Sequence, residues 1–207
     1  MLKKQKVVVF DFDGTMNARD ANMEFGKYCF RRSLRPWLFL PVIIFGALLS
    51  LFDFKTTKMR SIKIIWREVM RRFVSEKLVK RLAPEFIKQH KKLRWNWVNA
   101  VVAKELPAKD VKVILISAGP DFLIPHLVND LKFDAVLTSD MQKHKPWKFN
   151  FFAWGDNKVV ILEKWARKNK IQPIVLRSYG DSYGDTPLMA RAQEAIWIDS
   201  KNGNRRV

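Results

Sequence analysis

Short apolar runs recur along the chain and are separated by segments whose apolar residues have helical spacing. The runs occupy residues 6–10, 111–117, 135–138 and 173–181. Between them, two sets share a helical period: Phe122, Leu123, Leu127 and Leu131, and then Val159, Val160, Leu162, Trp165 and Ala166. Strands that alternate with helices favour a parallel sheet whose two faces are both covered. The pattern therefore predicts an α/β fold.

Polar residues follow three of the predicted strands. Asp11, Ser117 and Asp181 each come where an apolar run ends. In parallel sheets of this kind, ligands bind outside the carboxyl ends of the strands. We therefore expect these three side chains to share one edge of the sheet and to form a binding site there.

The sequence DFDGT, which follows the first run, carries the strongest chemical signal. Asp11 and Asp13 are two residues apart and point the same way, which is costly unless a cation or a catalytic role compensates for it. Gly14 lets the backbone turn closely around a ligand, and Thr15 suits the loop that follows. The plainer alternative is a surface turn, because Asp-Gly is a common turn pair.

Two further segments offer groups that suit a phosphate. Ser117 is followed by Ala118 and Gly119, whose backbone N–H groups can hold a phosphate oxygen, although the same residues could simply cap a helix. Lys158 lies at the start of a predicted helix, where a buried ammonium could neutralise phosphoryl charge. A lysine in that place is more often solvated.

The sequence YGDSYGDTPLM, at residues 179–189, is more specific. Asp181 and Asp185 would project from this loop toward a cation. Thr186 and Pro187 would then open the next helix, because proline fits the first turn of a helix.

Charge and composition narrow the partners. The 207 residues include 39 Lys and Arg against 20 Asp and Glu, a formal net charge of +19, so the surface should attract nucleic acid, anionic lipid or a phosphorylated substrate. The length suits one domain, or one domain with a sizeable insertion. Cys29 is the only cysteine, which excludes an intramolecular disulfide and fits a reducing compartment. Export is not expected, because MLKKQK leads directly into a strand.

Taken in order, DFDGT, Ser117, the segment 155–158 and GDSYGD resemble the four motifs of the haloacid dehalogenase superfamily, in its phosphoserine-phosphatase-like subgroup. The resemblance covers about residues 5–30 and 110–195, and Met16 stands where leucine is usual. It implies a Rossmann-like parallel sheet of the haloacid dehalogenase type, with a helical cap inserted after the first strand.

The resemblance also implies domain boundaries. The catalytic core would consist of residues 1–25 and 109–207, and the cap would be formed by residues 26–108.

Catalytic roles follow from the same resemblance. Asp11 would be the nucleophile that forms an aspartyl phosphate, and Asp13 the acid that protonates the leaving oxygen and then activates water. Lys158 would neutralise phosphoryl charge. The substrate-binding residues would be Gly14, Thr15, Ser117, Ala118 and Gly119.

The implied cofactor is Mg²⁺, which prefers hard oxygen ligands and water. Its ligands would be Asp11, the main-chain carbonyl of Asp13, and Asp181. Asp185 would support the metal or orient Lys158.

Within the predicted cap, residues 36–52 carry no charge and are rich in Leu, Ile, Val and Phe. The run is at the short limit for spanning a bilayer, and basic residues flank both ends. A single crossing would separate Asp11 from Asp181, so we expect a shallow or re-entrant hairpin at the cytoplasmic face of a membrane. The alternative is a buried core helix or a dimer interface. Residues 55–82 then have the pattern of a basic amphipathic helix or of an ordinary cap helix.

These features predict a Mg²⁺-dependent phosphomonoester hydrolase that acts on a membrane lipid phosphate such as phosphatidylglycerophosphate. In architecture the chain also resembles the phosphatidylglycerophosphatases of this superfamily. The alternative is a cytoplasmic phosphatase for a small soluble phosphomonoester of the phosphoserine type. A third possibility, a non-catalytic basic protein that binds lipid or nucleic acid, is disfavoured by the intact acidic motifs, and nucleic acid is not the expected partner. The oligomeric state stays open.

Overall fold

A computed structural model of the chain describes residues 2–32, 75–105, 110–142 and 148–206. The chain divides into two compact units. The first comprises residues 1–22, 87–140 and 151–207, and the second comprises residues 23–86 and 141–150. The predicted core and cap boundaries stay a prediction.

A six-stranded sheet is the centre of the fold, with the order β4-β3-β2-β1-β5-β6. The pairs β1/β2, β1/β5, β2/β3 and β5/β6 are all parallel. This arrangement confirms the predicted α/β class. The strands are β1 (Lys3–Phe10), β2 (Val111–Pro120), β3 (Ala135–Met141), β4 (Phe149–Phe151), β5 (Ile171–Gly180) and β6 (Glu194–Trp197).

The register of the central strands brings the predicted site residues to one edge. Phe10, the last residue of β1, pairs with Leu115 in β2 and with Tyr179 in β5. Asp11 follows the last residue of β1. Because of this register, it lies at about the same level of the sheet as Ser117 near the end of β2 and Asp181 after the end of β5. Neighbouring strands lie about 5 Å apart, so the three positions are neighbours at the carboxyl end of the sheet.

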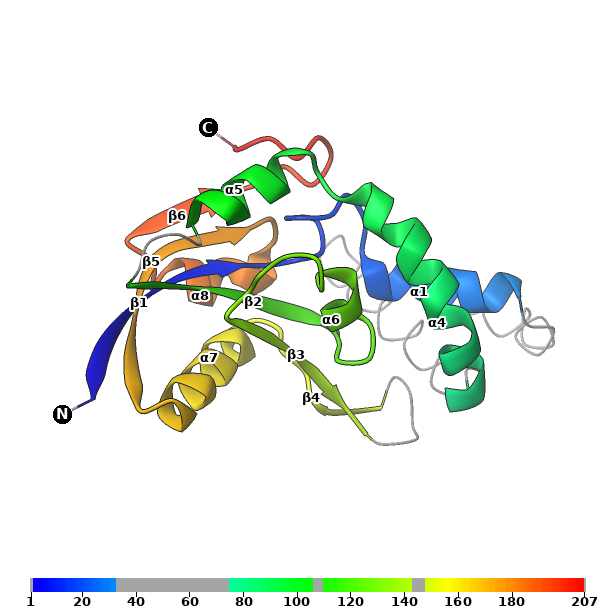
Figure 1. The fold of residues 1–207 in the computed structure, drawn as a ribbon, viewed down its shortest axis with the longest axis horizontal. Coiled ribbons are helices and arrows are strands. Elements are labelled where there is room, and N and C mark those ends of the chain that lie inside the picture. The colour runs from blue at the N-terminus through cyan, green and yellow to red at the C-terminus, as the bar shows by residue number, and fades with distance from the viewer. Residues whose placement is uncertain (1, 33–74, 106–109, 143–147, 207) are drawn as a thin grey trace, which may run out of the picture. The chain divides into compact units, whose positions relative to one another are not determined.

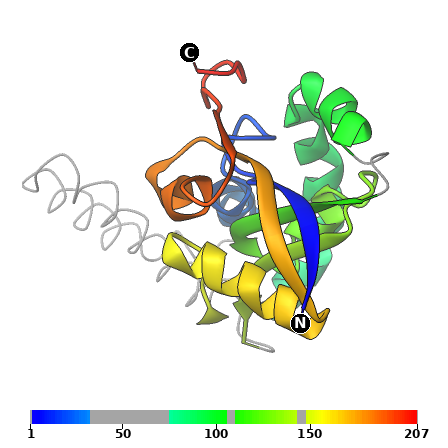
Figure 2. The ribbon, with the colours of Figure 1, turned by 90° about the vertical axis from the view of Figure 1, so that its left-hand side faces the viewer.

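Helices cover both faces of the sheet in the first unit. Figures 1 and 2 show α7 on one face and α5 on the other. Helix α7 buries Val159 and Leu162 against strand residues that include Val7, Val9 and Ile114. The helices of this unit are α5 (Trp97–Glu105), α6 (Ile124–Leu127), α7 (Asp156–Lys168) and α8 (Thr186–Met189), with 3₁₀ turns at Lys91–Leu93 and Tyr183–Asp185.

The observed elements differ from the predicted pattern in several places, among them strand β4, which no predicted run covers. The helix expected around residues 122–131 is reduced to α6, because the backbone leaves helical geometry at Val128 with φ −120° and ψ 10°. Strand β1 begins at Lys3 and not at residue 6, because its first, polar residues also pair with β5. Lys3 pairs with Ile171 at the beginning of β5. Strand β6 was not predicted, because Glu194 and Ala195 are exposed and give it no apolar run.

The second unit contains most of helices α1 (Ala21–Arg31) and α4 (Glu76–His90). Aromatic rings join them, since the ring of Phe86 lies 4.9 Å from that of Phe25 and 5.5 Å from that of Tyr28. Arg32 places its guanidinium 3.7 Å from the centre of the Tyr28 ring. Cys29 is buried, and burial raises the pKa of its thiol to about 12, so it stays protonated.

The predicted membrane-associated segment 36–52 lies outside the described residues, and so does most of the predicted amphipathic segment 55–82. Within the described ranges, no helix combines the length and the apolar character that crossing a membrane requires.

Candidate active site

Asp11 lies at the end of β1 with both carboxylate oxygens engaged. Its amide donates to the carbonyl of Tyr179 at 2.9 Å, which extends the β1/β5 pairing by one residue. Oδ1 accepts from Lys158 Nζ at 2.6 Å, and Oδ2 accepts from the hydroxyl of Thr15 at 3.1 Å. The Asp11 side chain is therefore held in one orientation by groups from two different elements.

Lys158 comes from the first turn of α7 and is only 2% exposed. Its ammonium also donates to Asp185 Oδ1 at 2.5 Å, so it lies between two carboxylates. Burial alone would lower the pKa of Lys158, but the carboxylates of Asp11 and Asp185 outweigh that effect and raise it. The two carboxylates therefore favour the charged form of this buried lysine.

Asp185 organises the loop that follows β5. While Oδ1 meets Lys158, Oδ2 accepts from the amides of Asp181 and Ser182 at 3.3 Å and 3.1 Å, and from the Ser182 hydroxyl at 3.0 Å. Asp185 therefore contacts both Lys158 and the backbone of its own loop, while its role, to orient Lys158 or to support the metal, stays a prediction.

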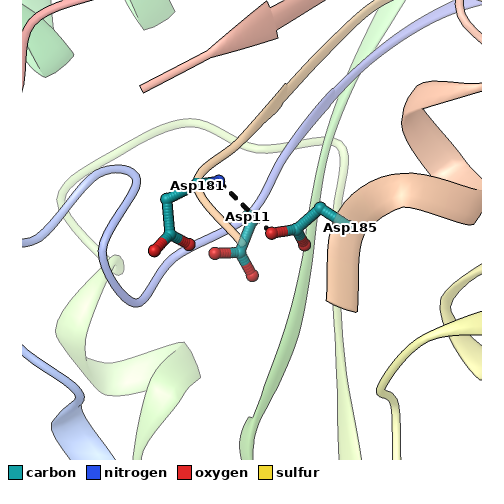
Figure 3. A group of neighbouring side chains, drawn as sticks. All are labelled: Asp11, Asp181 and Asp185. Carbon is teal, nitrogen blue, oxygen red and sulfur yellow. Dashed lines mark hydrogen bonds between the residues drawn. The ribbon is translucent and has the colours of Figure 1, made fainter. Parts of the chain in front are cut away.

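Three carboxylates gather at this edge and could hold a cation (Figure 3). Asp11, Asp181 and Asp185 each offer one oxygen, and these oxygens all lie within 4.8 Å of one another. Burial and the neighbouring Asp185 raise the pKa of Asp11 to about 7, and the same two causes raise the pKa of Asp181 to about 6. Asp11 and Asp185 are buried and Asp181 is half-buried. One ammonium does not neutralise three carboxylates, so the cluster favours a further positive charge.

Gly14 makes the close approach of two loops possible. Its φ is +81°, and a Cβ built there would lie 2.3 Å from Asp181 Oδ2. Any side chain at this position would displace the Asp181 carboxylate. The neighbouring Thr15 hydroxyl lies 3.4 Å from Asp181 Oδ1, so the loop after Asp11 packs directly on the candidate cation site.

Asp13 is not one of the three clustered carboxylates. Its Oδ1 accepts from the backbone amide of Ala21 at 2.6 Å, where α1 begins. Burial, followed by the nearby charge of Asp20, raises the pKa of Asp13 well above its usual value. A raised pKa suits a carboxyl group that donates a proton. That the main-chain carbonyl of Asp13 binds a metal stays a prediction.

The predicted phosphate-binding residues Ser117, Ala118 and Gly119 belong to the last part of β2. Ser117 is buried, and its hydroxyl accepts from the amide of Gly119 at 2.9 Å. The carbonyl of Ala118 accepts from the hydroxyl of Ser139 at 2.7 Å. These bonds fix this segment beside Asp11, while its binding of phosphate stays a prediction.

Sequence reasoning missed one residue that contacts the site. Arg206 donates from Nη2 to the main-chain carbonyl of Asp181 at 3.0 Å. No motif contains this residue, and the contact depends on how the chain folds back after β6.

Comparisons with known proteins agree with this geometry. Residues 8–190 match the family model described as haloacid dehalogenase-like hydrolase, which confirms the resemblance read from the four motifs. A comparison with curated proteins found no match.

Several solved structures share the fold. A protein of unknown function from Bordetella pertussis Tohama I superposes with a TM-score of 0.72 at 14% identity, over 95% of this chain and 91% of that one. A phosphoserine phosphatase solved as an analogue of its phospho-aspartyl intermediate gives 0.59 at 18% identity, over 95% and 87%. A phosphoserine phosphohydrolase-like protein from Francisella tularensis gives 0.58 at 16% identity, over 94% and 87%. At these identities the likeness establishes the fold.

Proposed function

Because the chain belongs to the haloacid dehalogenase-like hydrolase family, we propose that it hydrolyses a small soluble phosphomonoester of the phosphoserine type through an aspartyl-phosphate intermediate. The observation that carries the proposal is the buried contact of Asp11 with Lys158, at 2.6 Å, beside two further carboxylates. A carboxylate and an ammonium in contact suit attack on an anionic phosphoryl group. Phosphoserine phosphatases are among the structures that share the fold.

Mg²⁺ fits the residues at the site. Asp11, Asp181 and Asp185 supply hard oxygen ligands within reach of one another, and Gly14 leaves space against Asp181 that a side chain would fill. When bound, Mg²⁺ would neutralise phosphoryl charge and favour the ionised form of the nearby carboxylates.

In the first step, an oxygen of Asp11 attacks phosphorus, and the bond from phosphorus to the ester oxygen breaks. Lys158 holds the other Asp11 oxygen and offsets charge as the phosphoryl group arrives. The leaving oxygen takes a proton from Asp13, whose raised pKa suits this role. The products of this step are an alcohol and an aspartyl phosphate.

In the second step, water attacks the phosphorus of the aspartyl phosphate. Asp13, now ionised, accepts the proton of that water, and the bond between phosphorus and Asp11 breaks. Inorganic phosphate leaves, and both carboxyl groups return to their starting states. The backbone bond from Ala21 to Asp13 Oδ1 keeps the side chain in place, so Oδ2 is the oxygen that can carry the proton.

The soluble substrate replaces membrane lipid phosphate as the preferred assignment. The lipid prediction rested on residues 36–52, which lie outside the described residues. The fold is shared with phosphoserine phosphatases, which supports the phosphoserine-type alternative. A cytoplasmic location stays part of this proposal.

A phosphate-release assay on a panel of substrates tests the proposal. The panel contains phosphoserine and other small phosphomonoesters, lysophosphatidic acid, phosphatidic acid, phosphatidylglycerophosphate in vesicles, and a 3′-phosphorylated oligonucleotide. Each is measured with and without Mg²⁺. We expect the highest kcat/KM for a small soluble ester, and no turnover once the metal is removed by chelation.

The Asp11→Asn variant is the control for contaminating phosphatases. A preference for phosphatidylglycerophosphate over every soluble ester would return the assignment to the lipid substrate. Turnover by the chelated protein, or undiminished turnover by Asp11→Asn, would refute the mechanism.

A further inference from the structure

The segment after β6 folds back as a tight turn that reaches the carboxyl end of the sheet. Asp199 closes the turn, since its carbonyl accepts from Gly203 at 2.7 Å and its amide donates to Asn204 at 2.8 Å. Ile198 and Arg205 then form an antiparallel bridge. The next amide, that of Arg206, donates to the carbonyl of Trp197 at 2.7 Å. We call residues 198–206 the return turn.

The return turn is fixed to β5 immediately before the candidate cation site. The amide of Ile198 donates to the carbonyl of Gly180 at 2.8 Å. From the other side of the turn, Arg206 Nη2 donates to the carbonyl of Asp181 at 3.0 Å. The carbonyls of two successive residues, Gly180 at the end of β5 and Asp181 after it, therefore accept hydrogen bonds from the return turn.

The same turn contacts the segment that supports the loop after Asp13. Gly203 has a φ of +74°, and a Cβ built there would lie 2.4 Å from the Trp95 ring, so the ring packs on the bare backbone. Trp95 in turn donates its amide to the carbonyl of Met16 at 3.1 Å. The return turn thus connects the two loops that carry Asp13 and Asp181.

We propose that Arg206 is a positioning residue that holds the Asp181 loop in the geometry required to bind a divalent cation. The proposal rests on the proposed function, because it takes the three-carboxylate cluster as the metal site. The Arg206 guanidinium makes its hydrogen bond to the backbone of Asp181, so the carboxylate of Asp181 stays available for the cation.

Two effects of Arg206 on a cation have opposite signs, which makes the proposal testable. A guanidinium near the cluster repels a cation, so loss of its charge alone would strengthen metal binding. Loss of the hydrogen bond frees the Asp181 carbonyl, and loss of an outer partner that orients a ligand typically weakens metal binding about 10-fold or more. The proposal therefore predicts weaker binding in spite of the removed charge.

The experiment measures binding of Mn²⁺ by the full-length, metal-free protein without substrate, by electron paramagnetic resonance. Mn²⁺ takes the same oxygen ligands as Mg²⁺ and has a direct spectroscopic signal. We expect Arg206→Ala and Arg206→Gln to raise the Kd for Mn²⁺ about 10-fold. Arg206→Lys, which keeps a charged donor, should restore binding close to that of the parent protein.

Arg205→Ala is the matched control. Arg205 belongs to the same turn and carries the same charge. Its guanidinium pairs with Glu194 at a distance of 3.0 Å, and this pair lies away from the carboxylate cluster. Its replacement should leave the Kd unchanged. If Arg206→Ala had a much lower melting temperature than Arg205→Ala, the binding of Mn²⁺ would be compared between Arg206→Gln and Arg206→Lys instead.

Unchanged or tighter Mn²⁺ binding in the Arg206 variants would overturn the positioning role. The Asp11→Asn variant separates this result from failure of the metal site itself. If Asp11→Asn weakens Mn²⁺ binding and the Arg206 variants do not, only the positioning role is wrong. If Asp11→Asn binds Mn²⁺ as the parent does, the cluster is not the metal site and both proposals fall.

Discussion

Two buried clusters of charged side chains lie in the first unit of this protein, and they are balanced very differently. In the candidate active site, the carboxylates of Asp11, Asp181 and Asp185 lie together, and the Lys158 ammonium pairs with those of Asp11 and Asp185. In the other cluster, the single carboxylate of Glu105 in α5 meets one guanidinium, that of Arg177 in β5, at 2.5 Å. The first cluster has an excess of negative charge, whereas the second is neutral.

The neutral cluster is also packed as part of the core. The Tyr179 hydroxyl lies 3.5 Å from Glu105, and the Tyr179 ring stacks on Phe10 at 4.3 Å. Burial and the nearby Glu105 raise the pKa of Tyr179 to about 12, so the hydroxyl stays a neutral donor. We infer that the Glu105 cluster serves the stability of the fold, while the unbalanced cluster gives up stability in order to attract a cation.

The largest expected effect is the loss of turnover in Asp11→Asn. An amide cannot replace the nucleophilic carboxylate, so kcat should fall by at least about 10³-fold. The same change removes one of three clustered negative charges, so the melting temperature of the metal-free protein should stay equal or rise. Phosphate release and a thermal melt of the same preparation measure both. A variant that is inactive only because it is unfolded would contradict this separation of activity from stability.

The Lys158→Met variant should lose both activity and stability. It removes the ammonium that pairs with the buried Asp11 and Asp185, and leaving such charges unpaired typically costs about 3 to 5 kcal/mol of unfolding free energy. Urea unfolding of the metal-free protein at pH 7 measures the loss.

The double variant Lys158→Met with Asp185→Asn is the control for that charge argument. It should recover part of the lost stability, because one carboxylate is removed together with the ammonium. Equal losses in the single and double variants would mean that packing of the lysine stem, and not charge, explains the effect.

From the strand ends the sequence predicted that Asp11, Ser117 and Asp181 share one edge, and the family resemblance added Lys158 and Asp185. The structure brings Asp11, Lys158 and Asp185 into contact, while their catalytic roles stay predictions. Their contacts arise because parallel strands bring their carboxyl ends to one edge.

The Glu105 cluster and the return turn could not be predicted in the same way. Glu105 and Arg177 are joined only because α5 packs over β5, and neither residue belongs to a motif. Arg206 reaches Asp181 through a turn set by Asp199 and Gly203, whose hydrogen bonds leave no apolar pattern in the sequence. Contacts of this kind depend on packing and backbone geometry, which a single sequence does not display.

Glu105→Gln should have the reverse effect of Asp11→Asn. It leaves the Arg177 guanidinium without its carboxylate, but the Arg177 side chain is 37% exposed and water can solvate it. We therefore expect a loss of about 1 to 3 kcal/mol in unfolding free energy, with kcat/KM at saturating Mg²⁺ unchanged. Urea unfolding and steady-state kinetics measure the two quantities. A large fall in kcat/KM without a loss of stability would mean that the Glu105 cluster acts on the site.

The smallest expected effect is a dependence of stability on pH that the carboxylates of the active site, Asp13 included, produce. In the metal-free protein, the pKa values of Asp11 and Asp181 are raised from the usual 3.8 to about 7 and about 6. The folded state therefore binds more protons than the unfolded state between about pH 4 and pH 7, and its stability falls as the pH rises through that window. Asp130, whose pKa Arg94 holds below the usual range, affects stability only at lower pH.

Mg²⁺ should counteract that loss, because it replaces the protons as the positive charge in the cluster. We expect a larger rise in melting temperature on adding Mg²⁺ at pH 7.5 than at pH 5, where protons already occupy the carboxylates. Thermal melts with and without Mg²⁺ across this pH range measure the effect. Asp11→Asn should flatten the profile of melting temperature against pH. Glu105→Gln should shift that profile without changing its slope. Equal Mg²⁺ shifts at both pH values, or parallel profiles for the parent and Asp11→Asn, would contradict the view that the unbalanced carboxylates are what the cation stabilises.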